Sequence, residues 1–107
     1  MIDPYNYVFI SYFILTLELT LVADKKECSG SEIDADFFNT LDGCASHCKG
    51  KASMFAFGTN DYGNDRCNTE GCRCLCETSA TEKGTCEIKD HDGYRLYRYP
   101  NANNSGD

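Results

Sequence analysis

Apolar residues recur along this chain at two spacings, and each spacing predicts a kind of element. Between Ile33 and Cys48 they follow one another at steps of four, four, three and four, which describes one face of a helix. Ser31 stands where a helix N-cap is expected, with acidic residues in the first turn, and Gly50 suits the position just after the helix end. The pattern predicts a helix over residues 32–49.

Short segments rich in apolar, aromatic and cysteine residues, bounded by polar turn residues, predict a small antiparallel sheet. The predicted strands are residues 53–57, 71–77, 85–89 and 93–99. A hairpin turn at residues 90–93 joins the last two, and the Gly, Asn and Asp residues of 58–69 form a loop. With the helix, this predicts an α+β fold, one helix packed on a small antiparallel sheet.

A mostly apolar stretch at residues 8–22 precedes these elements and ends at the small residue Ala23. This is typical of a secretory signal peptide before its cleavage site. We therefore expect a signal peptide over residues 1–23, a single domain over 24–99 and a polar, disordered tail over 100–107. The stretch has no basic start and is interrupted by Glu18, so an uncleaved anchor or a buried element of the fold are the alternatives.

The chain of 107 residues contains eight cysteines, all of them after the predicted leader. A leader together with an even number of cysteines indicates an oxidising compartment, so we expect a secreted, disulfide-rich protein. Each bridge would add about 2–4 kcal/mol to a domain whose core is small. The residues expected to form disulfides are Cys28, Cys44, Cys48, Cys67, Cys72, Cys74, Cys76 and Cys86.

The spacing of the cysteines narrows the roughly one hundred possible connectivities. Cys44 and Cys48 share one face of the predicted helix, and the cysteines at 72, 74 and 76 share one face of a strand. The first two can therefore bridge two of the other three. Cys28 and Cys86 could tie the two ends of the domain together. Cys67 is then left for the remaining strand cysteine, for example the one at 72 across a small loop.

Four segments of the chain carry a resemblance to a known family: residues 44–48, 54–58, 72–76 and 93–97. Their order, a Cys-x3-Cys helix, an aromatic strand ending in Gly, a cysteine-rich strand and a Gly-Tyr strand, resembles the PAN/apple domain superfamily. The resemblance covers residues 28–99. It implies a helix linked by disulfides to a curved sheet and another bridge joining the ends, a role that Cys28 and Cys86 would suit.

WSC-type carbohydrate-binding modules are similar in the Cys-x3-Cys helix and in the Gly-then-Cys-x-Cys stretch. The chain departs from both families in its triple alternating cysteine and in the composition of residues 58–69. Both resemblances imply an extracellular binding module that recognises protein or carbohydrate without catalysis.

Charge restricts the class of partner. The formal net charge is −7, and it becomes −5 when the two acidic residues of the predicted leader are removed. Nucleic acids and anionic lipids are bound through basic patches, so we expect neither as a partner. An extracellular protein or glycan is compatible with this charge, and no pattern indicates the oligomeric state.

No arrangement of catalytic residues stands out, so we expect no enzyme, no cofactor and no metal. All eight cysteines can pair, which leaves no thiol nucleophile. His47 and His91 could complete a zinc site with the strand cysteines. The one-residue gaps between those cysteines, however, are not the spacing of structural zinc sites. Residues 60–65 offer side-chain oxygens for calcium, yet not at the spacing of an EF-hand loop.

The last predicted strand and the 58–69 loop are the expected binding surfaces. Arg95, Tyr97 and Tyr99 share one face of a regular strand, and Tyr and Arg are enriched in binding hot spots. The candidate ligand-binding residues are Tyr97, Tyr99, Arg95, Asp61 and Tyr62. One alternative is that the tyrosines simply pack in the sheet. Another is a small cysteine-rich effector, a toxin or protease inhibitor, that acts through the loop.

Asn103 begins an N-glycosylation sequon in the predicted tail. A glycan is expected there only if the protein is secreted.

Overall fold

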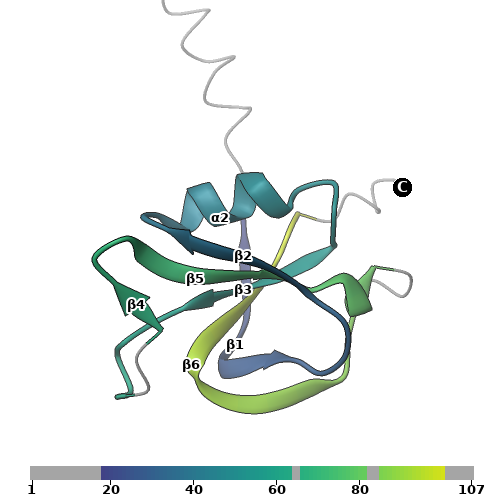
Figure 1. The fold of residues 1–107 in the computed structure, drawn as a ribbon. Helices are drawn as coiled ribbons and strands as arrows, with labels where there is room; N and C mark the ends of the chain where they lie inside the picture. The colour runs from purple at the N-terminus through teal and green to yellow at the C-terminus, as the bar shows by residue number, and fades with distance from the viewer. Residues whose placement is uncertain (1–17, 64–65, 82–84, 101–107) are drawn as a thin grey trace, which may run out of the picture.

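The computed structural model describes residues 18–63, 66–81 and 85–100. Within them the elements are β1 (Thr20–Cys28), β2 (Ile33–Phe38), α2 (Leu41–Cys48), β3 (Met54–Gly58), β4 (Cys67–Asn68), β5 (Gly71–Cys76), the 3-10 helix η1 (Thr78–Ala80) and β6 (Ile88–Arg98). The strands form one antiparallel sheet in the order β1-β6-β3-β5-β2, with β4 paired to β5 (Figure 1). The fold is the disulfide-rich α+β arrangement predicted from the sequence.

The helix is shorter than the apolar spacing predicts. α2 starts after Thr40, whose hydroxyl accepts a hydrogen bond from the Gly43 N–H at 2.9 Å, so Thr40 and not Ser31 is the N-cap. The end is as predicted, because Gly50 follows it with φ +84°. The prediction of a helix over residues 32–40 is wrong, since this part of the chain contains β2.

The spacing of four between Ile33 and Phe37 fits a strand as well as a helix, because residues two or four apart share a face of a regular strand, and β2 also contains a bulge. Asp36 has φ +66°, and its N–H donates to Oδ1 of Asp34 at 2.9 Å. The register with β5 shifts between Asp34 and Phe37. The bulge places Ile33 opposite Cys76 and Phe37 opposite Arg73, so these two side chains lie on opposite faces of the sheet although they are four residues apart.

β6 is one continuous strand where a hairpin was predicted. It lies between β1 and β3 and pairs with both, so the predicted turn at residues 90–93 does not form and residues 85–87 lie outside the strand. Lys26 pairs with Asp90 but Asp24 pairs with Arg95, so several residues of β6 bulge opposite Lys25. β6 accordingly bends through a wide arc (Figure 1).

β1 begins at Thr20, inside the stretch predicted as a leader. A leader ending at Ala23 would include four residues of this strand, three of which pair with β6. The described residues contain no helix that is long and apolar enough to cross a membrane. The predicted tail, with Asn103, lies outside the described residues except for Pro100.

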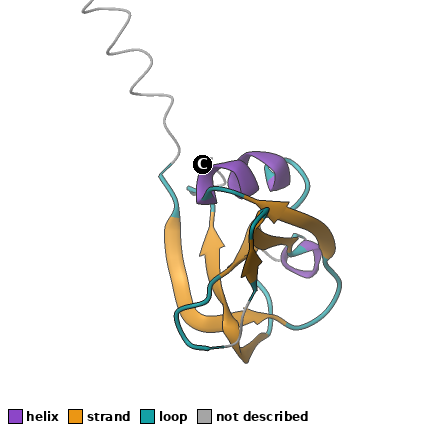
Figure 2. Ribbon diagram, turned by 60° about the vertical axis from the view of Figure 1, so that its left-hand side comes forward, coloured by secondary structure: helices purple, strands orange, loops and turns teal. Residues whose placement is uncertain are grey.

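The sheet has apolar residues on both faces. One face packs against α2, which contacts β2, β3 and β5 and lies over the sheet in both views (Figure 1, Figure 2). The buried residues of this face are Cys44, Ala45, Cys48, Ala52, Phe55, Cys74 and Cys76. Those of the other face are Cys28, Met54, Ala56, Leu75, Ala80, Tyr94 and Leu96.

Four disulfides fix this arrangement. The helix is bridged to β5 by Cys44–Cys74 and Cys48–Cys76, which is the pairing that the matching helix and strand spacings favoured. The other two bridges are Cys28–Cys86 and Cys67–Cys72. The eight cysteines are all described, and none is free.

Candidate binding groove beside Arg95

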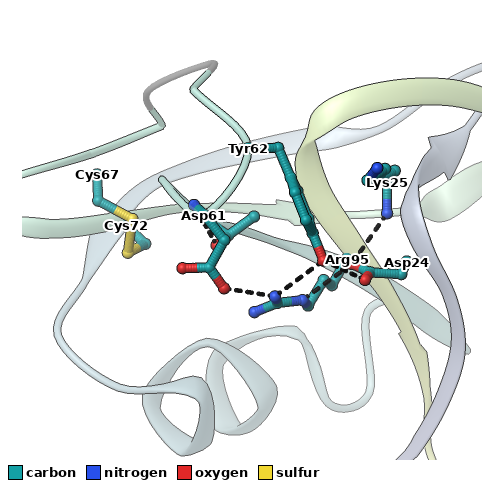
Figure 3. Close-up of polar contacts among 8 residues, drawn as sticks. Asp24, Lys25, Asp61, Tyr62, Cys67, Cys72 and Arg95 are labelled. Carbon is teal, nitrogen blue, oxygen red and sulfur yellow. Dashed lines mark hydrogen bonds and ion pairs between the residues drawn. A yellow bond between two sulfur atoms is a disulfide. The ribbon is translucent and has the colours of Figure 1, made fainter.

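Arg95 is the centre of a cluster formed by three parts of the chain. It extends from β6, and its Nε donates to Oδ1 of Asp24 on the paired strand β1 at 2.9 Å. Its Nη2 donates to Oδ2 of Asp61 and lies 3.3 Å from the hydroxyl of Tyr62, both in the 58–69 loop. Figure 3 shows the guanidinium between the two carboxylates, with the Tyr62 hydroxyl directed at the same point.

A bulge in β1 positions the other side of this cluster. Lys25 has φ +61°, a conformation that non-glycine residues rarely adopt, and its N–H donates to Oδ1 of Asp24 at 3.1 Å. The Lys25 ammonium lies 4.5 Å from the centre of the Tyr62 ring, within the range of a cation–π contact. The bulge thus places a carboxylate and an ammonium against the loop.

The charges of this cluster are balanced. The hydroxyl of Tyr62, and then the guanidinium of Arg95, lower the pKa of Asp24 from its ordinary value. The same hydroxyl and the Asp61 carboxylate raise the pKa of Arg95. Asp24 and Arg95 therefore keep their charges at neutral pH, and the planar guanidinium is held from several sides.

A groove of about 450 Å³ borders the cluster on the face of the sheet that carries α2. Its lining includes Leu41, Phe57, Asn60, Asp61, Arg95 and Tyr97. Phe57 and Tyr97 come from the neighbouring strands β3 and β6, and Leu41 is the first residue of α2. The groove combines an apolar floor with the polar groups of the loop.

The loop that forms one wall of the groove is held at both ends. Oδ1 of Asn60 accepts hydrogen bonds from the N–H groups of Arg66 and Cys67, each at 2.9 Å. Cys67 is bridged to Cys72 on β5, and both half-cystines line the groove. A wall fixed in this way loses little conformational freedom when a ligand binds.

The structure brings four of the five predicted ligand-binding residues together. Arg95, Asp61 and Tyr62 form the cluster, and Tyr97 lines the adjacent groove. Tyr97 also stacks on Phe55 with ring centres 5.4 Å apart, so part of its ring belongs to the core.

Tyr99 is the exception among the predicted residues. Its ring lies against Phe55, 5.3 Å away, and its hydroxyl donates to the carbonyl of Ala45 on α2. Burial raises the pKa of this hydroxyl, which stays protonated as a donor. In the structure Tyr99 therefore joins the helix to the sheet.

Sequence reasoning missed Asp24, Lys25, Leu41 and Phe57. Asp24 and Lys25 directly follow the predicted cleavage site, where no strand was expected. Leu41 was treated as part of a helical core face. The only available signal was the pair Phe55 and Phe57, which alternation placed on one face of the predicted strand.

A second groove, of about 490 Å³, lies on the opposite face of the sheet. Its lining includes Glu32, Asp34, Arg73 and Tyr94. Arg73 pairs with Asp34 and lies over the ring of Phe37 at 4.8 Å. None of the predicted ligand-binding residues lines this groove.

The residues of the alternative zinc, thiol and calcium sites have other partners in the structure. All eight cysteines are in disulfides, so none can act as a thiolate ligand or nucleophile while oxidised. The ring of His47 lies 5.3 Å from that of Phe38, and Nδ1 of His91 accepts the N–H of Gly93 at 3.0 Å. Asn60 and Asp61 of the suggested calcium loop bind the loop backbone and Arg95, respectively.

No protein-family model, curated protein or solved structure matches this chain.

Proposed function

We propose that the protein is a secreted, non-catalytic binding module that recognises a neutral carbohydrate in the groove beside Arg95. The observation that carries this proposal is the balance of charge around the groove. Asp24, Asp61 and Arg95 neutralise one another in part, and Lys25 adds the remaining positive charge. Recognition then depends on hydrogen bonds and on apolar contact, which suits a ligand rich in hydroxyl groups.

The chemistry of the lining supports this choice. Carboxylate, amide and guanidinium groups, here Asp61, Asn60 and Arg95, supply both donors and acceptors for hydroxyl groups. Tyr97 and Phe57 supply aromatic surface against which the apolar face of a sugar ring can pack. Fixed polar groups on an apolar floor are the usual composition of a small-ligand site.

The disulfides support the extracellular assignment. Four bridges in one small domain are typical of proteins that fold and act in an oxidising environment. Helix-to-sheet bridges and a bridge between distant segments are also the arrangement that the apple/PAN-like resemblance implies.

The test is a glycan array with the oxidised protein, followed by calorimetric titration of the best neutral oligosaccharide. We expect Asp61→Asn and Tyr97→Ala each to weaken binding at least about tenfold, a loss of about 1.4 kcal/mol. Asp90→Asn is the matched control, because Asp90 is an exposed carboxylate that pairs with Lys26 outside the groove.

Two outcomes would overturn the proposal. If no carbohydrate binds while the protein inhibits a protease tightly, the effector reading through the 58–69 loop is correct. If a protein ligand binds and Asp61→Asn leaves its affinity unchanged, the groove is not the recognition surface. Near-ultraviolet circular dichroism of Tyr97→Ala checks that this variant still folds.

A further inference from the structure

Three carboxylates meet on the face of the sheet opposite α2. Glu27 is in β1, Glu32 lies just before β2, and Glu77 follows β5. One oxygen from each side chain lies within 4.8 Å of the others. Three residues far apart in the sequence thus direct like charges at one point.

Glu77 is the most constrained of the three. Its side chain is completely buried, and Oε2 accepts the N–H of Cys28 at 3.2 Å. Oε1 has no hydrogen-bond partner within the part of the chain that the structure describes. A buried carboxylate oxygen without a partner costs about 1–3 kcal/mol or more, so native proteins rarely leave one empty.

The neighbouring cations reach only one of the three carboxylates. Nζ of Lys89 and Nε2 of His91 lie 3.7 Å and 4.0 Å from Oε2 of Glu27. Neither Glu32 nor Glu77 forms an ion pair among the described residues. Most of the negative charge at this point is therefore not compensated by the described side chains.

We propose that Glu27, Glu32 and Glu77 bind a divalent cation of the calcium class. All three offer hard oxygen ligands, which Ca²⁺ prefers and can accept from one or both oxygens of a carboxylate. The cation would give the orphaned Oε1 of Glu77 its missing partner. Glu32 is exposed and lines the second groove, so the point is accessible to ions and to the waters that complete the coordination.

The position of this site gives the cation a structural role. It would tie β1 to the segment before β2 and to the end of β5, next to the half-cystine Cys28. Without a cation the charge is relieved by a proton instead, because burial and then the adjacent Glu32 carboxylate raise the pKa of Glu77 to about 9. The site does not depend on the carbohydrate groove, which lies on the other face of the sheet.

The test is calorimetric titration of the chelator-treated, oxidised protein with CaCl₂ at neutral pH, accompanied by thermal unfolding with and without millimolar Ca²⁺. We expect one ion per chain, a melting temperature raised by Ca²⁺, and loss of both effects in Glu77→Gln. Glu32→Gln, at an exposed position, should fold normally and weaken Ca²⁺ binding at least about tenfold.

Glu70→Gln is the matched control, because Glu70 is an exposed glutamate next to β5 that belongs to neither the cluster nor the grooves. It should bind Ca²⁺ as the unmodified protein does. The proposal is overturned if millimolar Ca²⁺ neither binds nor raises the melting temperature. It is equally overturned if Glu32→Gln binds Ca²⁺ with unchanged affinity, since an ion bound elsewhere would then explain the signal.

Discussion

The two clusters of charged side chains in this protein have opposite electrostatic character. Around Arg95, two carboxylates of opposite charge to the guanidinium lie on either side of it. A phenol hydroxyl shares in their hydrogen bonds at a partly exposed surface. Around Glu77, three carboxylates face one another in a largely buried position. The first cluster is complete without a ligand, whereas the second leaves one oxygen without a partner.

β1 and β6 take part in both clusters, so the difference does not arise from separate parts of the fold. β1 provides Asp24 to one cluster and Glu27 to the other, and β6 provides Arg95 and His91. A cluster with balanced charges makes a surface more rigid. A cluster of like charges is stabilised only when it binds a proton or a cation. Because the two clusters use different side chains, a change to one of them leaves the other as an internal reference.

The largest effect is expected from pH, in metal-free protein. Because the pKa of Glu77 is raised from 4.5 to about 9, the folded state holds a proton that the unfolded state has lost between these values. The free energy of unfolding should therefore fall as the pH rises through this window, by at most about 1.4 kcal/mol per pH unit, and level off above it. Urea unfolding between pH 5 and 9 in the presence of a chelator measures this slope.

The groups that face Glu77 define the control for this experiment. Glu32 and Glu27 add negative charge, and Lys89 and His91 lie beside Glu27. Glu77→Gln should abolish most of the slope and raise stability at pH 9 by about 1–3 kcal/mol, because a neutral amide replaces a buried charge. A slope that persists in this variant would assign it to another group.

A smaller effect is expected when the chain starts at Asp24 instead of Thr20. The shorter form lacks Val22, which packs against the core, and three backbone pairings with β6. We expect it to lose about 1–2 kcal/mol of stability, with weaker carbohydrate binding, because Asp24 is then at a chain end. Urea unfolding of both forms measures the loss, and N-terminal sequencing of secreted protein shows which form occurs.

The other cluster is the reference for this truncation. Glu27 is next to Cys28, which remains bridged to Cys86, so the affinity for Ca²⁺ should be the same in both forms. Equal loss at both sites would mean that β1 acts as one unit and that the two clusters are not independent.

The smallest effect on stability is expected from Arg95→Lys. The charge is kept but the planar fork that joins two carboxylates is lost, at a cost of about 1 kcal/mol or less at this partly exposed position. Urea unfolding at low and high salt should show the cost shrinking as salt screens the pairs. Asp90→Asn is the control, and a change of the same size there would mean that Arg95 has no special position.

The local pattern of the sequence was sufficient for the helix-to-strand part of the disulfide framework, without deciding which strand cysteine pairs with which helix cysteine, and for part of the candidate site. Residues four apart on a helix and two apart on a strand are separated by nearly the same distance, so Cys44 and Cys48 could be matched to a cysteine-rich strand from the sequence alone. Strand alternation also placed Arg95 and Tyr97 on one face and Tyr94 on the other, as in the structure. These inferences needed only the geometry of one element at a time.

The same local reasoning failed where strand neighbours decide the outcome. Ile33 and Phe37 are four residues apart, a spacing that fits a strand as well as a helix, and only the pairing with β5 makes this segment a strand. In β6 the Asp-His-Asp-Gly segment bulges opposite Lys25 instead of forming a hairpin turn, because residues 88–90 and 95–98 on either side of it both pair with β1. Neither effect can be seen in the segment itself, since it depends on which strand lies alongside and in which register.

The sequence by itself determined the features that follow from one local repeat: the helix end at Gly50, the alternating faces of β5 and of residues 94–97 in β6, and the matching of the α2 cysteines to the cysteine-rich strand β5. The tertiary structure alone decided that Asp24 meets Arg95 and that Glu27, Glu32 and Glu77 converge. Charged side chains have no periodicity that marks their partners. Their electrostatic role is set by distance and burial, which exist only once the sheet is assembled.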